Sequence, residues 1–224
     1  MNLLPGWTPA VVAGEKTPAL TYVGHVYSLN NTTSVTVGSF SLPSPRSGRL
    51  FVAVIHDENS SISNVQLGGN SMSAVIAQTV FGPLSLSIYQ LQSNTLTGNV
   101  NVTYNLSQSE NSHAVGLYYI DYLSNISAHD SATEVKDFLT NNASVQINVP
   151  SNGVVIAGAS QSDSNLANIS WTGVSENYDY EDAGRNFGSS GASVSELAAE
   201  TNRTISINTS AAVGDLGLVA ASWG

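Results

Sequence analysis

Several short segments of this chain alternate apolar residues with Asn, Ser or Thr. Clear examples are 84–88 (Leu-Ser-Leu-Ser-Ile), 100–106 (Val-Asn-Val-Thr-Tyr-Asn-Leu) and 145–149 (Val-Gln-Ile-Asn-Val). A period of two places successive side chains on opposite faces of an extended strand, so that one face is buried and the other meets water. Turn residues separate such segments, and 68–70 (Gly-Gly-Asn) is typical of a tight hairpin. The pattern therefore predicts β-strands joined by short turns.

From residue 20 onward the strand signals are dense, with many Val, Ile, Tyr and Thr residues. Two segments, 131–139 and 194–201, are also compatible with helix, although the position of the second between strands favours a strand. The predicted strands are 20–29, 33–41, 49–56, 63–68, 71–78, 84–92, 98–106, 114–123, 144–149, 153–160, 167–172, 193–200, 203–208 and 215–223.

Four segments are apolar on both faces: 50–55, 114–123, 154–159 and 216–223. Continuous apolar runs indicate strands that are covered on both sides. We therefore predict an all-β fold, a two-sheet antiparallel β-sandwich of jelly-roll-like form. An arm, a loop or a partner subunit is expected to cover the outer face of the central strands. No internal repeat or linker is evident, so residues 20–224 are predicted to form a single domain.

Residues 1–19 have no hydrophobic period and contain three prolines. We predict an extended N-terminal arm that contacts a partner, because such a segment has no core of its own. Trp7 is the expected anchor, since buried aromatic residues dominate binding energy at interfaces. The other residues expected to bury there are Leu3, Leu4, Val11 and Val12.

The composition of the chain argues against several classes of function. Charged residues make up only 10% of the chain and the net charge is −10, which argues against nucleic-acid binding. The chain has no cysteine, so thiol chemistry and disulfides are excluded and assembly in a reducing host cytoplasm is favoured. The N-terminus lacks the pattern of a signal peptide, and no apolar run is long enough to span a membrane. We expect no membrane partner and no cofactor.

The densest acidic segment is 176–182, which predicts a solvated loop containing Tyr178 and Asp179. Tyrosines beside acids are common in sugar-binding surfaces, and carboxylates are ligands for Ca²⁺, so this segment is a candidate glycan or calcium loop. The EF-hand spacing is not present, because Ala183 occupies a ligand position. The candidate residues are Tyr178, Asp179, Tyr180, Glu181 and Asp182.

Catalytic motifs are weak. The histidine–aspartate pairs at 56–57 and 129–130 are predicted to lie at the surface or in loops. The segment 158–162 (Gly-Ala-Ser-Gln-Ser) lacks the second glycine of a nucleophile elbow. Tyr118 and Tyr122 are interpreted as core or rim residues, and Trp171 and Trp223 as core residues. The sequence therefore favours a protein that is not an enzyme.

One series of strand motifs resembles a jelly-roll-like β-sandwich module of tailed-phage and prophage particle proteins. The resemblance covers residues 20–224 and implies a structural or adhesive role on a virion, as a capsid decoration protein or a head or tail fibre component. It implies capsid or tail subunits as partners and a homo-oligomer, and it supplies no catalytic residue. The motifs are 50–55 (Leu-Phe-Val-Ala-Val-Ile), 62–72, 87–91, 97–104, 114–121, 145–149, 153–159 and 218–223.

Two alternatives remain at this point. The protein could be a carbohydrate-binding or host-adhesion module with an exposed Tyr, Asp and Asn patch. It could also be a hydrolase whose catalytic groups come from distant loops, because triads are defined by geometry and not by sequence order.

Overall fold

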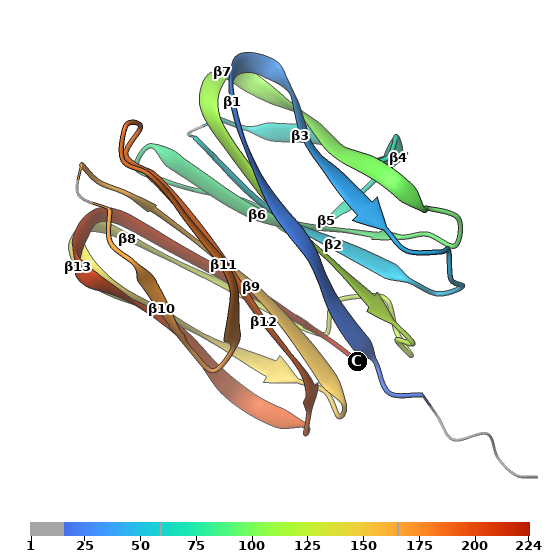
Figure 1. Cartoon of the computed structure of the whole chain (residues 1–224). Coiled ribbons are helices and arrows are strands. Elements are labelled where there is room, and N and C mark those ends of the chain that lie inside the picture. The colour runs from blue at the N-terminus through green and yellow to red at the C-terminus, as the bar shows by residue number, and fades with distance from the viewer. Residues whose placement is uncertain (1–15, 59, 165) are drawn as a thin grey trace, which may run out of the picture.

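The computed structural model describes residues 16–58, 60–164 and 166–224, and all regular elements in these ranges are β-strands (Figure 1). The candidate arm residues Leu3, Leu4, Trp7, Val11 and Val12 lie outside the described residues. The strands are β1 (Ala19–Leu42), β2 (Leu50–Glu58), β3 (Ile62–Leu67), β4 (Asn70–Ser71), β5 (Ser73–Phe81), β6 (Leu84–Gln92), β7 (Gly98–Asp121), β8 (Asp130–Val149), β9 (Gly153–Ser162), β10 (Ile169–Thr172), β11 (Ser175–Asp182), β12 (Phe187–Leu197) and β13 (Glu200–Trp223).

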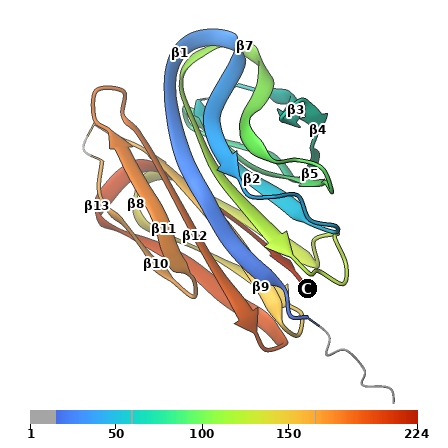
Figure 2. The same cartoon turned by 45° about the vertical axis from the view of Figure 1, so that its right-hand side comes forward.

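The strands form two antiparallel sheets, which confirms the predicted fold class. The first sheet has the order β4-β3-β7-β2-β6-β5, and β1 pairs with β7. The second has the order β10-β13-β9-β12-β11, and β8 pairs with β13. Figures 1 and 2 show the sheets stacked face to face, with the first in blue to green and the second in yellow to red.

Two long ribbons bend back over their own sheets. β1 and β7 each have 24 residues and pair along their whole length, with register shifts near Leu29 and Thr32. β8 and β13 form an equivalent ribbon with shifts between Asn208 and Asp215. The sequence predicted each of β1, β7 and β13 as two separate strands. The bulges explain the difference, because they bend a strand without ending it.

The helix considered for 131–139 is wrong, since this segment is the first half of β8. It pairs with 215–221 of β13, and its residues alternate between partly buried and exposed. Pairing with a buried strand outweighs the local helix propensity. The alternative helix at 194–201 is also absent, because β12 and β13 occupy this region.

Three apolar cores result from this curvature. The central core lies between the sheets and contains Leu50, Val52 and Val54 of β2 with Val154 and Ile156 of β9. Each sheet also has its own core, enclosed by the bent ribbon. Alternate residues of β2 and β9 therefore enter different cores, which explains their apolar runs. The predicted cover from an arm, loop or partner is corrected: the protein's own ribbons cover these strands.

The two halves of the chain have the same strand connectivity. β1, β2, β3, β5, β6 and β7 correspond to β8, β9, β10, β11, β12 and β13, and every pairing of the first set has its equivalent in the second. The bends of the two ribbons are also equivalent, because Thr32 donates a hydrogen bond to the carbonyl oxygen of Ser34 and Thr140 donates one to that of Asn142. The sequence shows no residue-level repeat, and the repeat is evident in the strand pairing.

Candidate functional site

The acidic segment 176–182 is not a loop, as was predicted, but almost the whole of β11, which pairs with β12. Tyr178 is buried in the central core, whereas Asp179 and Glu181 are exposed on the other face. Asp182 accepts a hydrogen bond of 2.8 Å from the hydroxyl of Tyr27. The alternation of aromatic and acidic residues is thus a strand pattern, and Tyr178 does not belong to an exposed Tyr and Asp patch.

His56 and Asp57 were expected at the surface, but both are fully buried. Nδ1 of His56 lies 2.8 Å from Oγ of Ser160, and Nε2 lies 2.8 Å from the hydroxyl of Tyr178. Burial lowers the pKa of His56 well below its ordinary value, with a smaller contribution from His25. These contacts connect β2 of the first sheet to β9 and β11 of the second.

The Ser160–His56 pair resembles part of a nucleophile–base arrangement, and Ser160 lies in the segment that partly matches a nucleophile elbow. Its environment does not fit catalysis, because Ser160 is fully buried and both ring nitrogens of His56 have partners. A catalytic base must reach the proton of a nucleophile that meets substrate. The pair instead satisfies polar groups inside the core, which would otherwise be costly to bury.

A second buried network lies on β2 and β7. Oδ2 of Asp57 accepts hydrogen bonds from the hydroxyl of Tyr104 at 2.7 Å and from Nδ1 of His113 at 2.9 Å. Nε2 of His113 lies 2.9 Å from the carbonyl oxygen of Asn30. Burial favours the neutral ring, but Asp57 and the carbonyl of Asn30 outweigh it and raise the pKa of His113. Both ring nitrogens face acceptors, so the doubly protonated ring fits this position.

A shallow pocket of about 320 Å³ contains the acids Glu58 and Glu110. The amide of Gln108 donates to Oε1 of Glu110 at 2.6 Å, and the backbone N–H of Asn111 donates to Oε2 of Glu58 at 2.9 Å. Burial, and then the proximity of Glu58, raise the pKa of Glu110, and the two carboxyl groups share a hydrogen bond. Glycosidases separate their carboxyl groups by about 5 Å or more to admit the substrate. This pair is too close for that chemistry.

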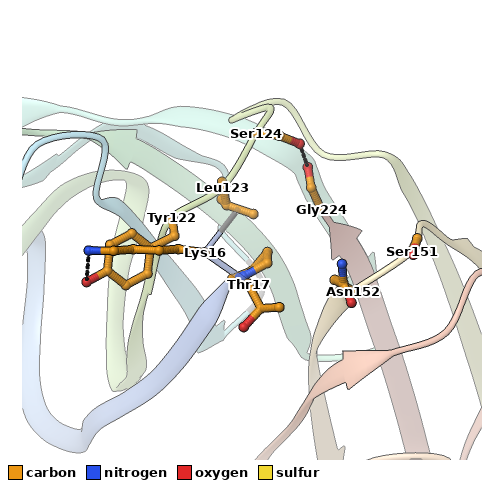
Figure 3. A pocket seen from close by; sticks show the side chains of 9 residues that line it. Lys16, Thr17, Tyr122, Leu123, Ser124, Ser151, Asn152 and Gly224 are labelled. Atoms are coloured by element: carbon orange, nitrogen blue, oxygen red, sulfur yellow. Dashed lines mark hydrogen bonds between the residues drawn. The ribbon is translucent and has the colours of Figure 1, made fainter. Parts of the chain in front are cut away.

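A larger, open pocket of about 610 Å³ lies where the N-terminal segment joins β1, and we call it the arm-root pocket (Figure 3). It is formed by the residues just before β1, the loop after β7, the turn between β8 and β9, and the residue that follows β13. Figure 3 shows Lys16 beside the ring of Tyr122, and the hydrogen bond from Ser124 to the carbonyl oxygen of Gly224. The pocket is lined by Lys16, Thr17, Pro18, Tyr122, Leu123, Ser124, Ser151, Asn152 and Gly224.

Cations gather around this pocket. Nζ of Lys16 lies 4.5 Å from the centre of the Tyr122 ring, and the guanidinium carbon of Arg46 lies 4.8 Å from it. Arg46 also donates a hydrogen bond to the hydroxyl of Tyr122 and lies 3.6 Å from Asp121. Tyr122 has a left-handed backbone with φ of 64°. An aromatic ring held between two cations forms a surface that suits an acidic or aromatic group.

Arg49, a third basic residue close to Arg46, is held in place by Asp121 and Tyr119. Arg49 donates two hydrogen bonds to Asp121, at 2.8 and 3.1 Å, and its guanidinium stacks on Tyr119. The hydrogen bonds to Asp121 raise the pKa of Arg49 and outweigh the effect of burial. Lys16, Arg46 and Arg49 are three of the chain's six basic residues. Residue spacing did not indicate this cluster, because its members come from three separate segments.

The described ranges contain no group of three or more His, Asp or Glu side chains that could hold a metal ion. They also contain no helix of the length and apolarity that crossing a membrane requires. Comparison with known proteins finds no family model and no curated protein that matches the chain.

Proposed function

We propose that this protein is a non-enzymatic structural component of a viral particle, a capsid decoration or fibre protein that binds neighbouring subunits through its N-terminal arm and exposed edges. The observation that carries the proposal is the arm-root pocket, where Tyr122 is contacted by Lys16, which lines the pocket, and by Arg46 beside it. The particle context comes from the resemblance of the strand motifs to tailed-phage particle proteins.

The way the protein uses its reactive side chains also supports a structural role. Inside the core, His56 forms hydrogen bonds with Ser160 and Tyr178, and Asp57 accepts hydrogen bonds from Tyr104 and His113. Groups that often perform acid–base or nucleophilic chemistry are here occupied in cross-linking strands. The surface is left to Asn, Ser and Thr, as on the exposed faces of β3, β7 and β8.

The adhesion alternative has less support. Its expected binding patch included Tyr178, which is buried against His56 and His25. Tyr180 is partly covered, because its ring packs in a tilted arrangement against that of Tyr27, with the ring centres 4.3 Å apart. A sugar-binding surface of this type needs exposed aromatic faces.

Particle binding tests the proposal. Parent particles stripped of this protein should rebind the full chain to saturation, as measured by sedimentation and densitometry. A chain lacking residues 1–15 should keep its β-sheet circular dichroism but bind at least about 10-fold more weakly, since interface anchors contribute most of the binding energy. Lys16→Gln/Arg46→Gln should also weaken binding.

The matched control is Arg185→Gln, which removes a cation that does not line the arm-root pocket and should bind like the original chain. Equal particle occupancy for the full and truncated chains would refute the role of the arm. Binding that fails for the full chain itself would refute the assignment to a particle.

A further inference from the structure

The ribbon of β8 and β13 carries an apolar tip. Phe138 and Leu139 have exposed fractions of 88% and 78%, the highest among the large hydrophobic side chains of the described residues. We call Phe138 and Leu139, with the preceding Asp137, the Phe138 tip. Soluble proteins tolerate single exposed apolar residues, but two adjacent ones this exposed indicate a binding function.

The backbone at the tip is strained. Asp137 pairs with Asp215 and Thr140 with Val213, so Phe138 and Leu139 lie in a bulge opposite Gly214. Both have left-handed conformations, with φ of 69° and 41°. Bulky residues avoid this region, and those that adopt it often lie at functional sites. These exposed side chains contribute nothing to a core, so core packing explains neither their exposure nor their backbone conformation.

The internal repeat supplies a comparison. Phe138 and Leu139 correspond to Asn30 and Asn31 of the first ribbon, because each pair lies in the same register shift and precedes an equivalent threonine, Thr140 or Thr32. Neither Asn30 nor Asn31 has a positive φ, both are polar, and the neighbouring Leu29 is less exposed than Phe138, at 48%. A ribbon of this connectivity can therefore bend without a strained aromatic tip. The tip is a property of the second ribbon alone.

The surroundings of the tip are acidic. Asp137 is exposed beside Phe138, Asp215 pairs with it from β13, and Asp163 follows the end of β9 close to Asp215. Lys136 is paired with Glu134 at 2.7 Å. Burial, followed by repulsion from Asp137 and Asp163, raises the pKa of Asp215. An apolar tip with an acidic collar fits a pocket that has apolar walls and a cationic rim.

The arm-root pocket has those properties. Pro18, Leu123 and the Tyr122 ring supply apolar wall, and Lys16 supplies positive charge. Arg46 contacts the Tyr122 ring from beside the pocket and lies 3.6 Å from Asp121. Its volume of about 610 Å³ is ample for a phenyl ring. Figures 1 and 2 show the bend of the β8/β13 ribbon at one end of the molecule and the arm root, near the C-terminus, at the other. A tip cannot reach the pocket of its own chain.

We propose that the Phe138 tip of one copy inserts into the arm-root pocket of a second copy, giving a head-to-tail contact. This inference rests on the proposed function, because it names one neighbouring subunit as another copy of the same chain. A head-to-tail contact joins two different surfaces, so it leads to a ring if the rotation closes and to a filament if it does not.

Sedimentation velocity over a range of concentrations tests the contact on the full chain. Phe138→Ser/Leu139→Ser should weaken self-association by about 30-fold, as expected for loss of an interface anchor. The tip is exposed, so this variant should fold normally. Leu29→Ser is the matched control and should associate like the original chain.

Mixing two variants makes the test specific for head-to-tail binding. Phe138→Ser/Leu139→Ser lacks the tip, and Lys16→Glu/Arg46→Glu lacks the cationic pocket. Each should be monomeric alone, and a mixture should form one-to-one dimers, because one intact tip meets one intact pocket. A mixture that stays monomeric, or a tip variant that associates normally, would overturn the proposal.

An original chain that is monomeric at all concentrations would also overturn it. That result is separable from failure of the proposed function, which the particle-binding experiment measures independently.

Discussion

At the residue scale, the main feature is a set of buried polar side chains that cross-link strands. Three histidines lie in the interior or at its edge: His25, His56 and His113. The sequence predicted surface positions for His56 and Asp57, because histidine and aspartate are more often exposed. It contained no signal for their partners, which are distant in the chain: Ser160 and Tyr178 for His56, and His113 for Asp57. Such networks depend on packing and cannot be predicted from local pattern.

His25 should make stability depend on pH. Burial lowers its pKa from 6.5 to about 4, and its ring stacks on Tyr178 beside His56 and Tyr180. Between these pH values the unfolded chain holds a proton on His25 that the folded chain does not. Its favourable contribution is therefore full above pH 6.5 and is lost as the pH falls toward 4.

Urea unfolding of the original chain and of His25→Phe measures this effect. The difference in unfolding free energy should change by on the order of 2 kcal/mol against the original chain between the upper and lower pH. His129→Phe is the control, because the His129 ring is exposed in the folded chain. A difference that is constant with pH would contradict a buried, neutral His25.

At the element scale, the sequence predicted strands well where alternation was strong. β6 was predicted with its observed bounds, and the hairpin at Gly68 and Gly69 is confirmed by φ values of 55° and 80°. The errors have a common cause. Segment 131–139 and β11 both contain several charged residues, so the sequence resembles a helix or a loop. Pairing with a buried neighbour, β13 or β12, decides their structure.

The packing of β11 on its neighbours depends on two glycines. The ring of Tyr178 lies directly over Gly116 of β7 and Gly191 of β12, where an added Cβ would collide with it. Tyr178 cannot move away easily, because His56 binds its hydroxyl and His25 stacks on its ring. Gly191→Ala should therefore lower the free energy of unfolding by about 1–3 kcal/mol.

A double-mutant cycle separates this collision from a general effect of alanine. In the Tyr178→Leu background, which has no ring at this position, Gly191→Ala should cost clearly less than in the original chain. Equal costs in both backgrounds, measured by urea unfolding, would show that Tyr178 is not what requires glycine there.

At the scale of the whole molecule, the chain consists of two halves of equal connectivity joined by the central core. The apolar runs correctly predicted strands buried on both sides, but they could not show that each half covers its own central strand. The arm-root pocket was also unpredictable, since Lys16, Arg46 and Tyr122 meet only after both sheets have formed. Whether the two halves unfold together depends on how strongly the central core couples them.

Trp223 tests that coupling. It ends β13 in the second half, is fully buried in the central core, and donates a hydrogen bond of 2.9 Å to Gln90 of β6 in the first half. Trp223→Ala should lower the free energy of unfolding by about 3–5 kcal/mol. Because both halves share this core, circular dichroism of all strands and fluorescence of Trp171 in the second half should report one coincident transition.

The control is Trp171→Phe, which changes a partly buried ring packed against the second sheet's own core and should cost less than the change at Trp223. Its circular dichroism transition should remain single. Two separated transitions in the original chain would show that the halves fold independently and that the central core is only a docking contact. A single transition that shifts as a whole in Trp223→Ala would mean that the central core makes one cooperative unit of the two repeats, as the proposed structural role requires.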